Sequence, residues 1–136
     1  MSNASILAGV SASLSAFEHA LQLQAAAAAV GFDWPEIGDI RNKIHEELVE
    51  LEQGLDNQDA ANTFEELGDV LFALTNLARR LQIDPAAALE ATNQKFIRRF
   101  QHMEQAATRE GSDLASEPLT MQIVRYRQAW AEDQTA

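Results

Sequence analysis

The chain has 136 residues and a formal net charge of −11, with 21 acidic residues, 10 basic residues and no cysteine. This length suits one domain, and the missing cysteines exclude disulfides, zinc thiolate sites and thiol redox chemistry. The charge argues against non-specific binding to nucleic acid or an anionic membrane, but not against a nucleotide bound through a metal ion. No apolar run approaches about 20 residues and no basic segment precedes the alanine-rich start, so we expect neither a membrane span nor a signal peptide. A soluble cytoplasmic protein is the default expectation.

The sequence predicts an all-α fold. Alanine is abundant, β-branched residues are sparse, and no alternating apolar run is bounded by hairpin turns. Residues 1–12 are expected to form a flexible N-terminus, followed by a single domain over residues 13–136. The three prolines fit first turns of helices, and Asp84 fits the N-cap before Pro85. We expect four to five helices, over about residues 13–30, 35–53, 58–81, 85–109 and 119–131.

The expected helix over residues 35–53 carries one apolar stripe, at positions 40, 44, 48, 51 and 55. Glu47 lies at the edge of this stripe and is expected to be half-buried. Glu50 lies somewhat further round the helix. Glu46 points nearly opposite the stripe, so it is expected to be solvated or to orient other groups.

The expected helix over residues 58–81 is apolar on more than one side. Its main stripe includes Phe64, Leu67, Leu71 and Leu74, whereas Phe72 falls elsewhere, close to Asp69 in azimuth. A helix of this kind belongs in the middle of a bundle or at a subunit interface.

The most informative pattern is a repeated pair of carboxylates three residues apart: Glu47 with Glu50, and Glu66 with Asp69. At about 100° per residue, each pair sits roughly 60° apart on one helix face. Between positions 44 and 69 there are nine acidic residues and no Lys or Arg. Unpaired carboxylates repel one another, so converging them costs stability unless a cation gathers them. If a short turn makes these two helices an antiparallel hairpin, the two pairs can face each other and bind Mg²⁺ or Mn²⁺, which indicates phosphate chemistry.

Two other interpretations of the acidic residues exist. They can be solvated helix faces, as acidic runs usually are. A carboxylate-bridged di-iron bundle would need Glu-x-x-His on two helices, and none of His19, His45 and His102 lies three residues after a glutamate.

Several segments together resemble one enzyme family. They are residues 30–35 (Val-Gly-Phe-Asp-Trp-Pro), the two acid pairs, residues 66–79 (Glu-Leu-Gly-Asp-Val-Leu-Phe-Ala-Leu-Thr-Asn-Leu-Ala-Arg) and residues 91–100 (Ala-Thr-Asn-Gln-Lys-Phe-Ile-Arg-Arg-Phe). In order and spacing they resemble the MazG nucleoside triphosphate pyrophosphohydrolases, and most of all the C-terminal domain of the two-domain bacterial proteins. The resemblance runs from about Phe17 to Trp130.

This resemblance implies an all-α helical bundle completed by dimerisation, with a homodimer or higher oligomer as the assembly. It implies Mg²⁺-dependent hydrolysis of nucleoside triphosphates to a nucleoside monophosphate and pyrophosphate, with a house-cleaning role on non-standard or excess nucleotides. The metal ligands it implies are Glu47, Glu50, Glu66 and Asp69.

The same resemblance suggests further roles. Glu46 or Glu65 would orient or deprotonate the attacking water. Lys95 with Arg98 or Arg99 would grip phosphate oxygens, unless these cations simply pair with the acidic helix. Trp34 and Asn76, and with less support Asn93, are candidate base or ribose contacts, although a Trp at position 34 also suits a core anchor.

The first helix departs from the family pattern. Relatives carry basic residues ahead of the Gly-Phe-Asp-Trp stretch, whereas residues 19–24 here read His-Ala-Leu-Gln-Leu-Gln, and the first forty residues hold no Lys or Arg. This departure is the best support for a second hypothesis: an acidic helical oligomerisation or binding module whose catalysis has lapsed.

Overall fold

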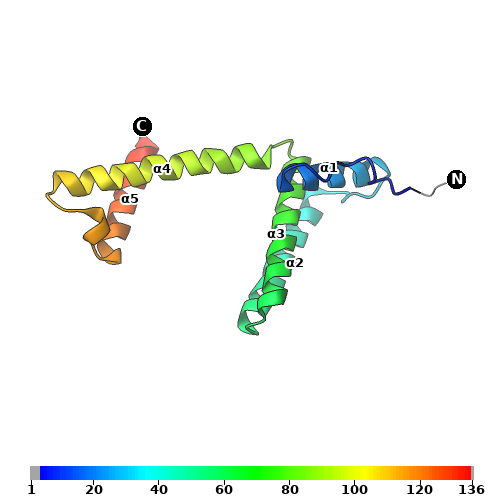
Figure 1. The fold of residues 1–136 in the computed structure, drawn as a ribbon, viewed down its shortest axis with the longest axis horizontal. Helices are drawn as coiled ribbons and strands as arrows, with labels where there is room; N and C mark the ends of the chain where they lie inside the picture. The colour runs from blue at the N-terminus through cyan, green and yellow to red at the C-terminus, as the bar shows by residue number, and fades with distance from the viewer. Residues whose placement is uncertain (1–3, 136) are drawn as a thin grey trace. The chain divides into compact units, whose positions relative to one another are not determined.

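The computed structural model describes residues 4–135, and this stretch is helical without a β-strand. The helices are α1 (Ala16–Ala29), α2 (Ile37–Asp56), α3 (Ala60–Arg80), α4 (Pro85–Arg109) and α5 (Leu119–Thr135), with a short 3-10 helix η1 (Leu114–Ser116) before α5 (Figure 1). The all-α prediction and the number of helices are confirmed. Within residues 4–135, no helix combines the length and the apolar character needed to cross a membrane.

The helix ends follow local capping chemistry. Asp84 caps α4 as predicted, because its carboxylate accepts a hydrogen bond from the Ala86 N–H at 2.9 Å. Pro35 lies outside α2 rather than in its first turn, since the N-cap is the extended residue Glu36, whose N–H donates to Asp39. Helix α5 continues to Thr135, four residues beyond its predicted end.

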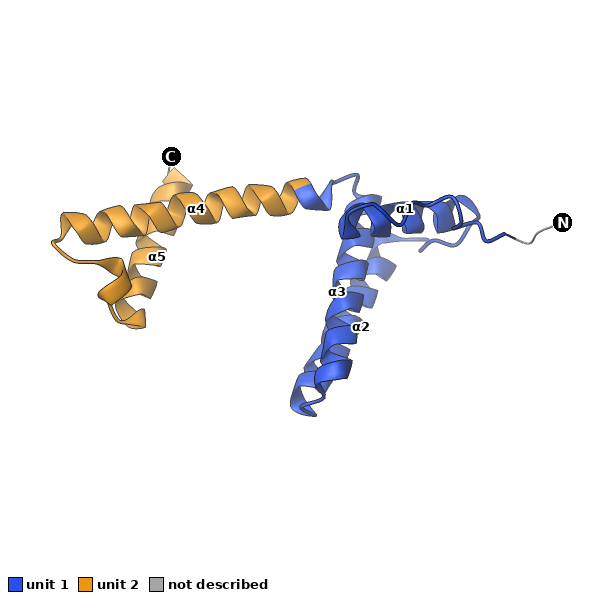
Figure 2. Ribbon diagram, in the orientation of Figure 1, with its two compact units in different colours: residues 1–86 blue, residues 87–136 orange. Residues whose placement is uncertain are grey.

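The chain divides into two compact units, residues 1–86 and 87–136 (Figure 2). Unit 1 contains α1, α2 and α3, and unit 2 contains most of α4 with η1 and α5. The single domain over residues 13–136 stays a prediction. Of the expected flexible N-terminus, residues 1–3 lie outside the described part, whereas residues 5–10 form hydrogen-bonded turns.

Helices α2 and α3 lie side by side as an antiparallel hairpin (Figure 1). Their connection is three residues long, and its middle residue, Gln58, has a positive φ of 53°. Asp59 caps α3 through the Asn62 N–H. The hairpin closes tightly at Gly54, where a Cβ atom would lie 3.1 Å from the side chains of both Asn62 and Thr63. The predicted hairpin is therefore confirmed, and it sets the register between the two acid pairs.

The apolar core of unit 1 is small. Ile40 of α2 and Val70 and Ala73 of α3 are buried, whereas Leu67, Leu71 and Leu74 of α3 are 45–49% exposed. Within residues 4–135, much of the main apolar stripe of α3 is therefore left uncovered. This agrees with a helix made for an interface, but the predicted dimerisation remains a prediction.

Unit 2 has its own core, formed by Met103, Ala107, Leu114 and Ala129. Arg125 of α5 is buried beside this core at 2% exposure. Its guanidinium donates hydrogen bonds to Glu117 and Glu110, which ties the loop before α5 to the end of α4.

Candidate active site

Three carboxylates converge between the helices of the hairpin. One oxygen each from Glu47, Glu66 and Asp69 lies within 4.8 Å of the other two. Helix α2 supplies Glu47, and α3 supplies the other two at a spacing of three residues, which places them on one face. Glu47 is only 6% exposed, which is deeper than the half-burial expected from the sequence. These three acidic groups could therefore hold a metal ion.

Glu50 joins this cluster through a side-chain hydrogen bond with Glu66. Burial, this hydrogen bond and the neighbouring negative charges of Glu50, Asp69 and Glu47 raise the pKa of Glu66 to about 7. Two carboxyl groups can share a hydrogen bond only if one of them carries a proton. Below about pH 7, a proton on Glu66 therefore relieves part of this crowding of charge.

The cluster contains two buried oxygens without a partner, Oε2 of Glu47 and Oε2 of Glu66. Buried polar atoms normally have a hydrogen-bond partner, so two such atoms side by side call for an explanation. A hard divalent cation bound by carboxylate oxygens would supply one. The donor set and the orphaned oxygens therefore both fit a metal centre.

One cation does reach the cluster, and the sequence analysis missed it. Lys43 lies one turn before Glu47, and its Nζ is 2.9 Å from Glu47 Oε1 and 3.4 Å from Glu46 Oε2. The count of basic residues began at position 44, so it stopped one residue short of Lys43. The i,i+4 spacing would have revealed the pair.

The two predicted acid–base residues lie outside the converging group. Glu46 is exposed and paired with Lys43, as its position opposite the apolar stripe predicted. Glu65 is also exposed. Their proposed action on a water molecule remains a prediction.

A pocket of about 600 Å³ lies in the same unit, lined by α1, α3 and the segment that precedes α2. The predicted base or ribose contacts Trp34 and Asn76 both line it, together with Gln24, Phe32 and Phe72. Asn76 lies seven residues after Asp69, which is two helical turns along nearly the same face of α3. The acidic cluster and the pocket thus share one helix as their common wall.

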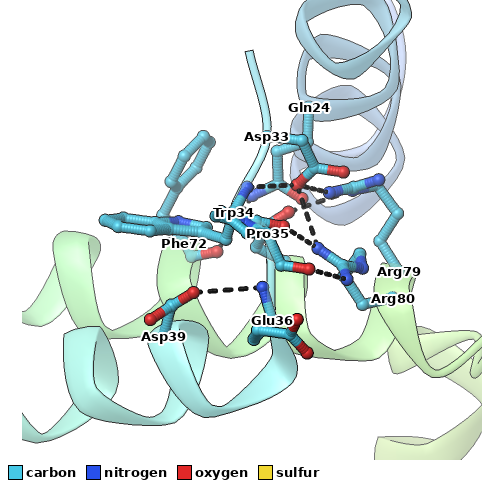
Figure 3. A network of polar contacts seen from close by, with 10 residues as sticks. Gln24, Asp33, Trp34, Pro35, Glu36, Asp39, Phe72, Arg79 and Arg80 are labelled. Carbon is cyan, nitrogen blue, oxygen red and sulfur yellow. Dashed lines mark hydrogen bonds and ion pairs between the residues drawn. The ribbon is translucent and has the colours of Figure 1, made fainter. Parts of the chain in front are cut away.

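An ion-pair clamp fixes the pocket wall that carries Trp34 (Figure 3). Asp33 Oδ1 accepts hydrogen bonds from Arg79 Nη2 at 2.7 Å and from the Trp34 N–H at 2.8 Å. Arg80 reaches the same oxygen, and it also donates to the backbone carbonyl groups of Trp34 and Pro35. Burial alone would raise the pKa of Asp33, but the hydrogen bonds from Arg79 and Trp34 outweigh it and hold the pKa below its usual value.

No sequence pattern indicated this clamp. Asp33 and Arg79 are 46 residues apart, so no helical spacing rule relates them. The only available signal was a pair of arginines in the last turn of α3 and an acid just before α2.

The predicted substrate contacts on α4 are placed within unit 2. Arg98 donates two hydrogen bonds to Asp133 of α5, at 2.6 and 2.8 Å, and Arg99 donates one at 3.0 Å. Asn93 is exposed and bonds to Glu90 on its own helix, and Lys95 is half-buried. The two arginines thus pair with α5 within unit 2. Their contact with phosphate remains a prediction.

Residues 36–104 match the MazG nucleotide pyrophosphohydrolase domain. The chain belongs to the MazG family. This match covers α2, α3 and most of α4, and therefore includes both acid pairs, but the pocket residues of α1 and of the segment around Trp34 lie before it. The resemblance inferred from the sequence motifs is confirmed.

Curated relatives agree with this assignment. The nucleoside triphosphate pyrophosphohydrolase/pyrophosphatase MazG of Thermotoga maritima is 36% identical over 120 residues, covering 88% of this chain and 46% of the relative. The nucleoside triphosphate pyrophosphohydrolase of Escherichia coli K12 is 38% identical over 123 residues, with 88% and 47% covered. The uncharacterized protein YabN of Bacillus subtilis is 54% identical over 50 residues, which is 37% of this chain and 10% of that protein. The chain thus spans about half the length of the two enzymes.

Proposed function

We propose that this MazG domain is a Mg²⁺-dependent nucleoside triphosphate pyrophosphohydrolase. It would add water to a ribo- or deoxyribonucleoside triphosphate and release a nucleoside monophosphate and pyrophosphate. The observation that carries the proposal is the cluster of Glu47, Glu66 and Asp69, which contains two buried oxygens without a partner. The Thermotoga maritima and Escherichia coli relatives are named as nucleoside triphosphate pyrophosphohydrolases, which supports the same reaction.

In this proposal Glu47, Glu50, Glu66 and Asp69 hold Mg²⁺, with Mn²⁺ as a substitute. The bound ion would offset the negative charge of the phosphate oxygens and lower the pKa of a water ligand. Glu66 must release its proton before it can act as a ligand, so metal binding competes with protonation near pH 7.

The other side chains would bind substrate and move a proton. Glu46 or Glu65 would accept the proton of the attacking water. The base or ribose would lie against Trp34 and Asn76 in the pocket. The remaining substrate contacts in the proposal are the α4 residues Asn93, Lys95, Arg98 and Arg99.

The assembly and cellular role belong to the same proposal. A homodimer or higher oligomer is supported by the exposed side chains of Leu67, Leu71 and Leu74 on α3. Removal of non-standard or excess nucleotides in the cytoplasm is the role that suits an enzyme of this type.

A second candidate function is an acidic helical binding module with lapsed catalysis. One observation favours it: α1 contains no Lys or Arg that could hold a triphosphate. A lapsed enzyme would have no need of a half-buried cluster of repelling carboxylates, so the intact acid pairs argue against it. Saturable thermal stabilisation by Mg²⁺ or Mn²⁺ would separate the two candidates.

The test is to incubate the purified protein with Mg²⁺ and a panel of standard and modified nucleoside triphosphates. The products are resolved as monophosphate, diphosphate, pyrophosphate and phosphate. Monophosphate with pyrophosphate is the expected outcome, and Asp69→Ala should remove it without loss of helicity. The matched control is Glu52→Gln, which changes an exposed acid of α2 outside the cluster. Absence of turnover together with absence of metal binding would favour the binding module.

A further inference from the structure

We propose that Gln24 determines which nucleobases the pocket accepts, because its Oε1 atom accepts a hydrogen bond from an N–H group of the base. This inference rests on the proposed nucleotide substrate and adds a recognition residue on α1. No motif in the sequence singled out Gln24.

The hydrogen bonding of Gln24 fixes the orientation of its amide. Its Nε2 donates to the backbone carbonyl oxygen of Phe72 at 3.0 Å, which joins α1 to α3. A carbonyl oxygen only accepts, so the amide nitrogen must face Phe72 and Oε1 must be the free end.

Gln24 is only 6% exposed, and its Oε1 atom is buried without a hydrogen-bond partner. Leaving such an acceptor unpaired costs stability, and replacing Gln24 by an apolar residue would avoid that cost. Gln24 lines the pocket, so a ligand there can supply the missing donor. A phosphate group of a nucleotide at neutral pH offers only acceptors to this atom, whereas a base offers N–H groups.

The rest of the pocket suits a flat heterocycle. Three aromatic side chains line it and remain open to solvent, with exposed fractions of 81% for Phe32, 41% for Trp34 and 49% for Phe72. Aromatic faces stack on any base, so they provide affinity without distinguishing one base from another by its hydrogen-bonding groups. Selection must then come from polar atoms in the wall, and Gln24 Oε1 is an unsatisfied one.

Asn76 offers the complementary group. Its Oδ1 accepts a hydrogen bond from Arg79 Nε at 3.0 Å, so its amide N–H groups are the side it can present to a ligand. The pocket therefore combines an acceptor on α1 with a donor on α3. A base edge that carries an N–H beside a ring nitrogen or a carbonyl oxygen matches this pair.

The clamp on Asp33 keeps this pocket preformed. Arg79 and Arg80 hold the segment that carries Trp34, and Gln24 emerges from α1 at the same place (Figure 3). A preformed wall lowers the ordering cost of binding, so a single hydrogen bond can discriminate between ligands.

The experiment measures base binding apart from hydrolysis. The chain contains two tryptophans, so Trp130→Phe leaves Trp34 as the sole tryptophan reporter in the pocket. In the presence of a chelator, uridine, cytidine, adenosine and guanosine are titrated against its fluorescence. Each nucleoside that binds is then compared with its counterparts methylated at the N–H positions of the base. We expect saturable binding of at least one nucleoside and a loss of about tenfold on methylation of the N–H that Gln24 reads.

The protein-side arm uses Gln24→Met, which keeps the length of the side chain but removes the acceptor. We expect affinity for the nucleoside to fall about tenfold, with unchanged affinity in the matched control Gln22→Met, an exposed position of the same helix. Circular dichroism checks that both variants fold. If Gln24→Met does not fold, the methylated nucleosides decide the question with the unchanged pocket.

Three results would overturn the proposal: no nucleoside binds, methylation at every base N–H leaves affinity unchanged, or folded Gln24→Met binds normally. The second result would point to a ribose hydroxyl as the donor. Hydrolysis of nucleoside triphosphates alongside any of these results would leave the proposed function intact. Discrimination between bases without hydrolysis of nucleoside triphosphates would support the proposed role of Gln24 and count against the proposed enzymatic activity.

Discussion

The two units gather carboxylates in opposite ways. In unit 2, Glu110 and Glu117 both accept hydrogen bonds from the buried Arg125, and Asp133 is held by two arginines. In unit 1, four carboxylates meet on the α2–α3 hairpin, and the ion pairs found among residues 4–135 bring only Lys43 to them. Carboxylates paired with arginine stabilise a fold, whereas carboxylates crowded together with few cations could hold a metal ion.

The pKa values of Asp133 in unit 2 and Glu66 in unit 1 reflect this difference. Hydrogen bonds from Arg98 and Arg99 hold the pKa of Asp133 down to about 2. Burial and neighbouring carboxylates raise the pKa of Glu66 to about 7. Charge composition alone does not separate these cases, because both regions are rich in acidic residues. The partner of each carboxylate decides its role.

The largest effect is expected from removing one charge of the crowded cluster. Glu66→Gln should lower the rate of nucleoside triphosphate hydrolysis by about 100-fold or more, because a proposed metal ligand is lost while the side-chain shape is kept. In metal-free buffer the same variant should melt at a higher temperature than the wild type, since repulsion is relieved. Steady-state kinetics and thermal melts with and without Mg²⁺ measure both effects, with Glu52→Gln as the control. Normal Mg²⁺-dependent turnover in Glu66→Gln would falsify the site assignment.

Breaking the arginine-paired cluster of unit 2 should destabilise the fold without touching the proposed chemistry. Arg125→Met leaves the carboxylate of Glu117, 7% exposed, without its partner, so we expect the melting temperature to fall by roughly 5–10 °C. The control Arg127→Met changes an exposed arginine of the same helix and should have little effect. Adding Glu117→Gln to Arg125→Met should recover part of the loss, because the buried charge disappears. An unchanged melting temperature in Arg125→Met would mean that Arg125 contributes nothing net to stability.

The pH dependence of stability should have opposite signs at the two clusters. The folded pKa of Glu66, about 7, exceeds its ordinary value of 4.5, so its stabilising contribution is present below pH 4.5 and is lost as pH rises through about 7. The folded pKa of Asp133, about 2, lies below 3.8, so its contribution is present above pH 3.8 and is lost as pH falls through about 2. Melting temperatures in chelator from pH 2 to 8 measure both. Glu66→Gln should flatten only the decline in melting temperature between pH 4.5 and 7. Asp133→Asn should change the melting temperature only below about pH 3.8. A decline that survives in Glu66→Gln would assign it to another group.

The smallest effect is expected at Lys43. Its ion pair with Glu47 is partly exposed, so Lys43→Met should cost only about 0.5 kcal/mol in metal-free stability. The same change removes a positive charge from the cluster, so the affinity for Mg²⁺ should rise a few-fold. Calorimetric titration with Mg²⁺ compares it with Arg41→Met, an exposed arginine of the same helix. Weaker Mg²⁺ binding in Lys43→Met would show that Lys43 helps to position Glu47 rather than compete with the ion.

The local features of this protein could be predicted from its amino-acid sequence. Helical periodicity, proline positions and capping residues predicted four to five helices, and α4 was placed at Pro85–Arg109 as observed. The acid pairs were found because a spacing of three residues within one helix fixes a common face whatever the rest of the chain does. The hairpin could be predicted from the short turn, so the proximity of Glu47 to Glu66 and Asp69 could be predicted as well. The family motifs are continuous segments of the sequence, so they too could be recognised without the tertiary structure.

The partners of residues far apart in the sequence could not be predicted, because they depend on the tertiary structure. Asp33 meets Arg79 across 46 positions, Gln24 meets Phe72 across 48, and Arg98 meets Asp133 across 35. No periodicity encodes such pairs, because they depend on how helices pack after they form. The proton on Glu66 and the unpaired oxygen of Gln24 follow from burial, which is a property of the packed helices. The sequence thus determined which chemical groups are available, and packing determined which of them remain unsatisfied and free to bind a ligand.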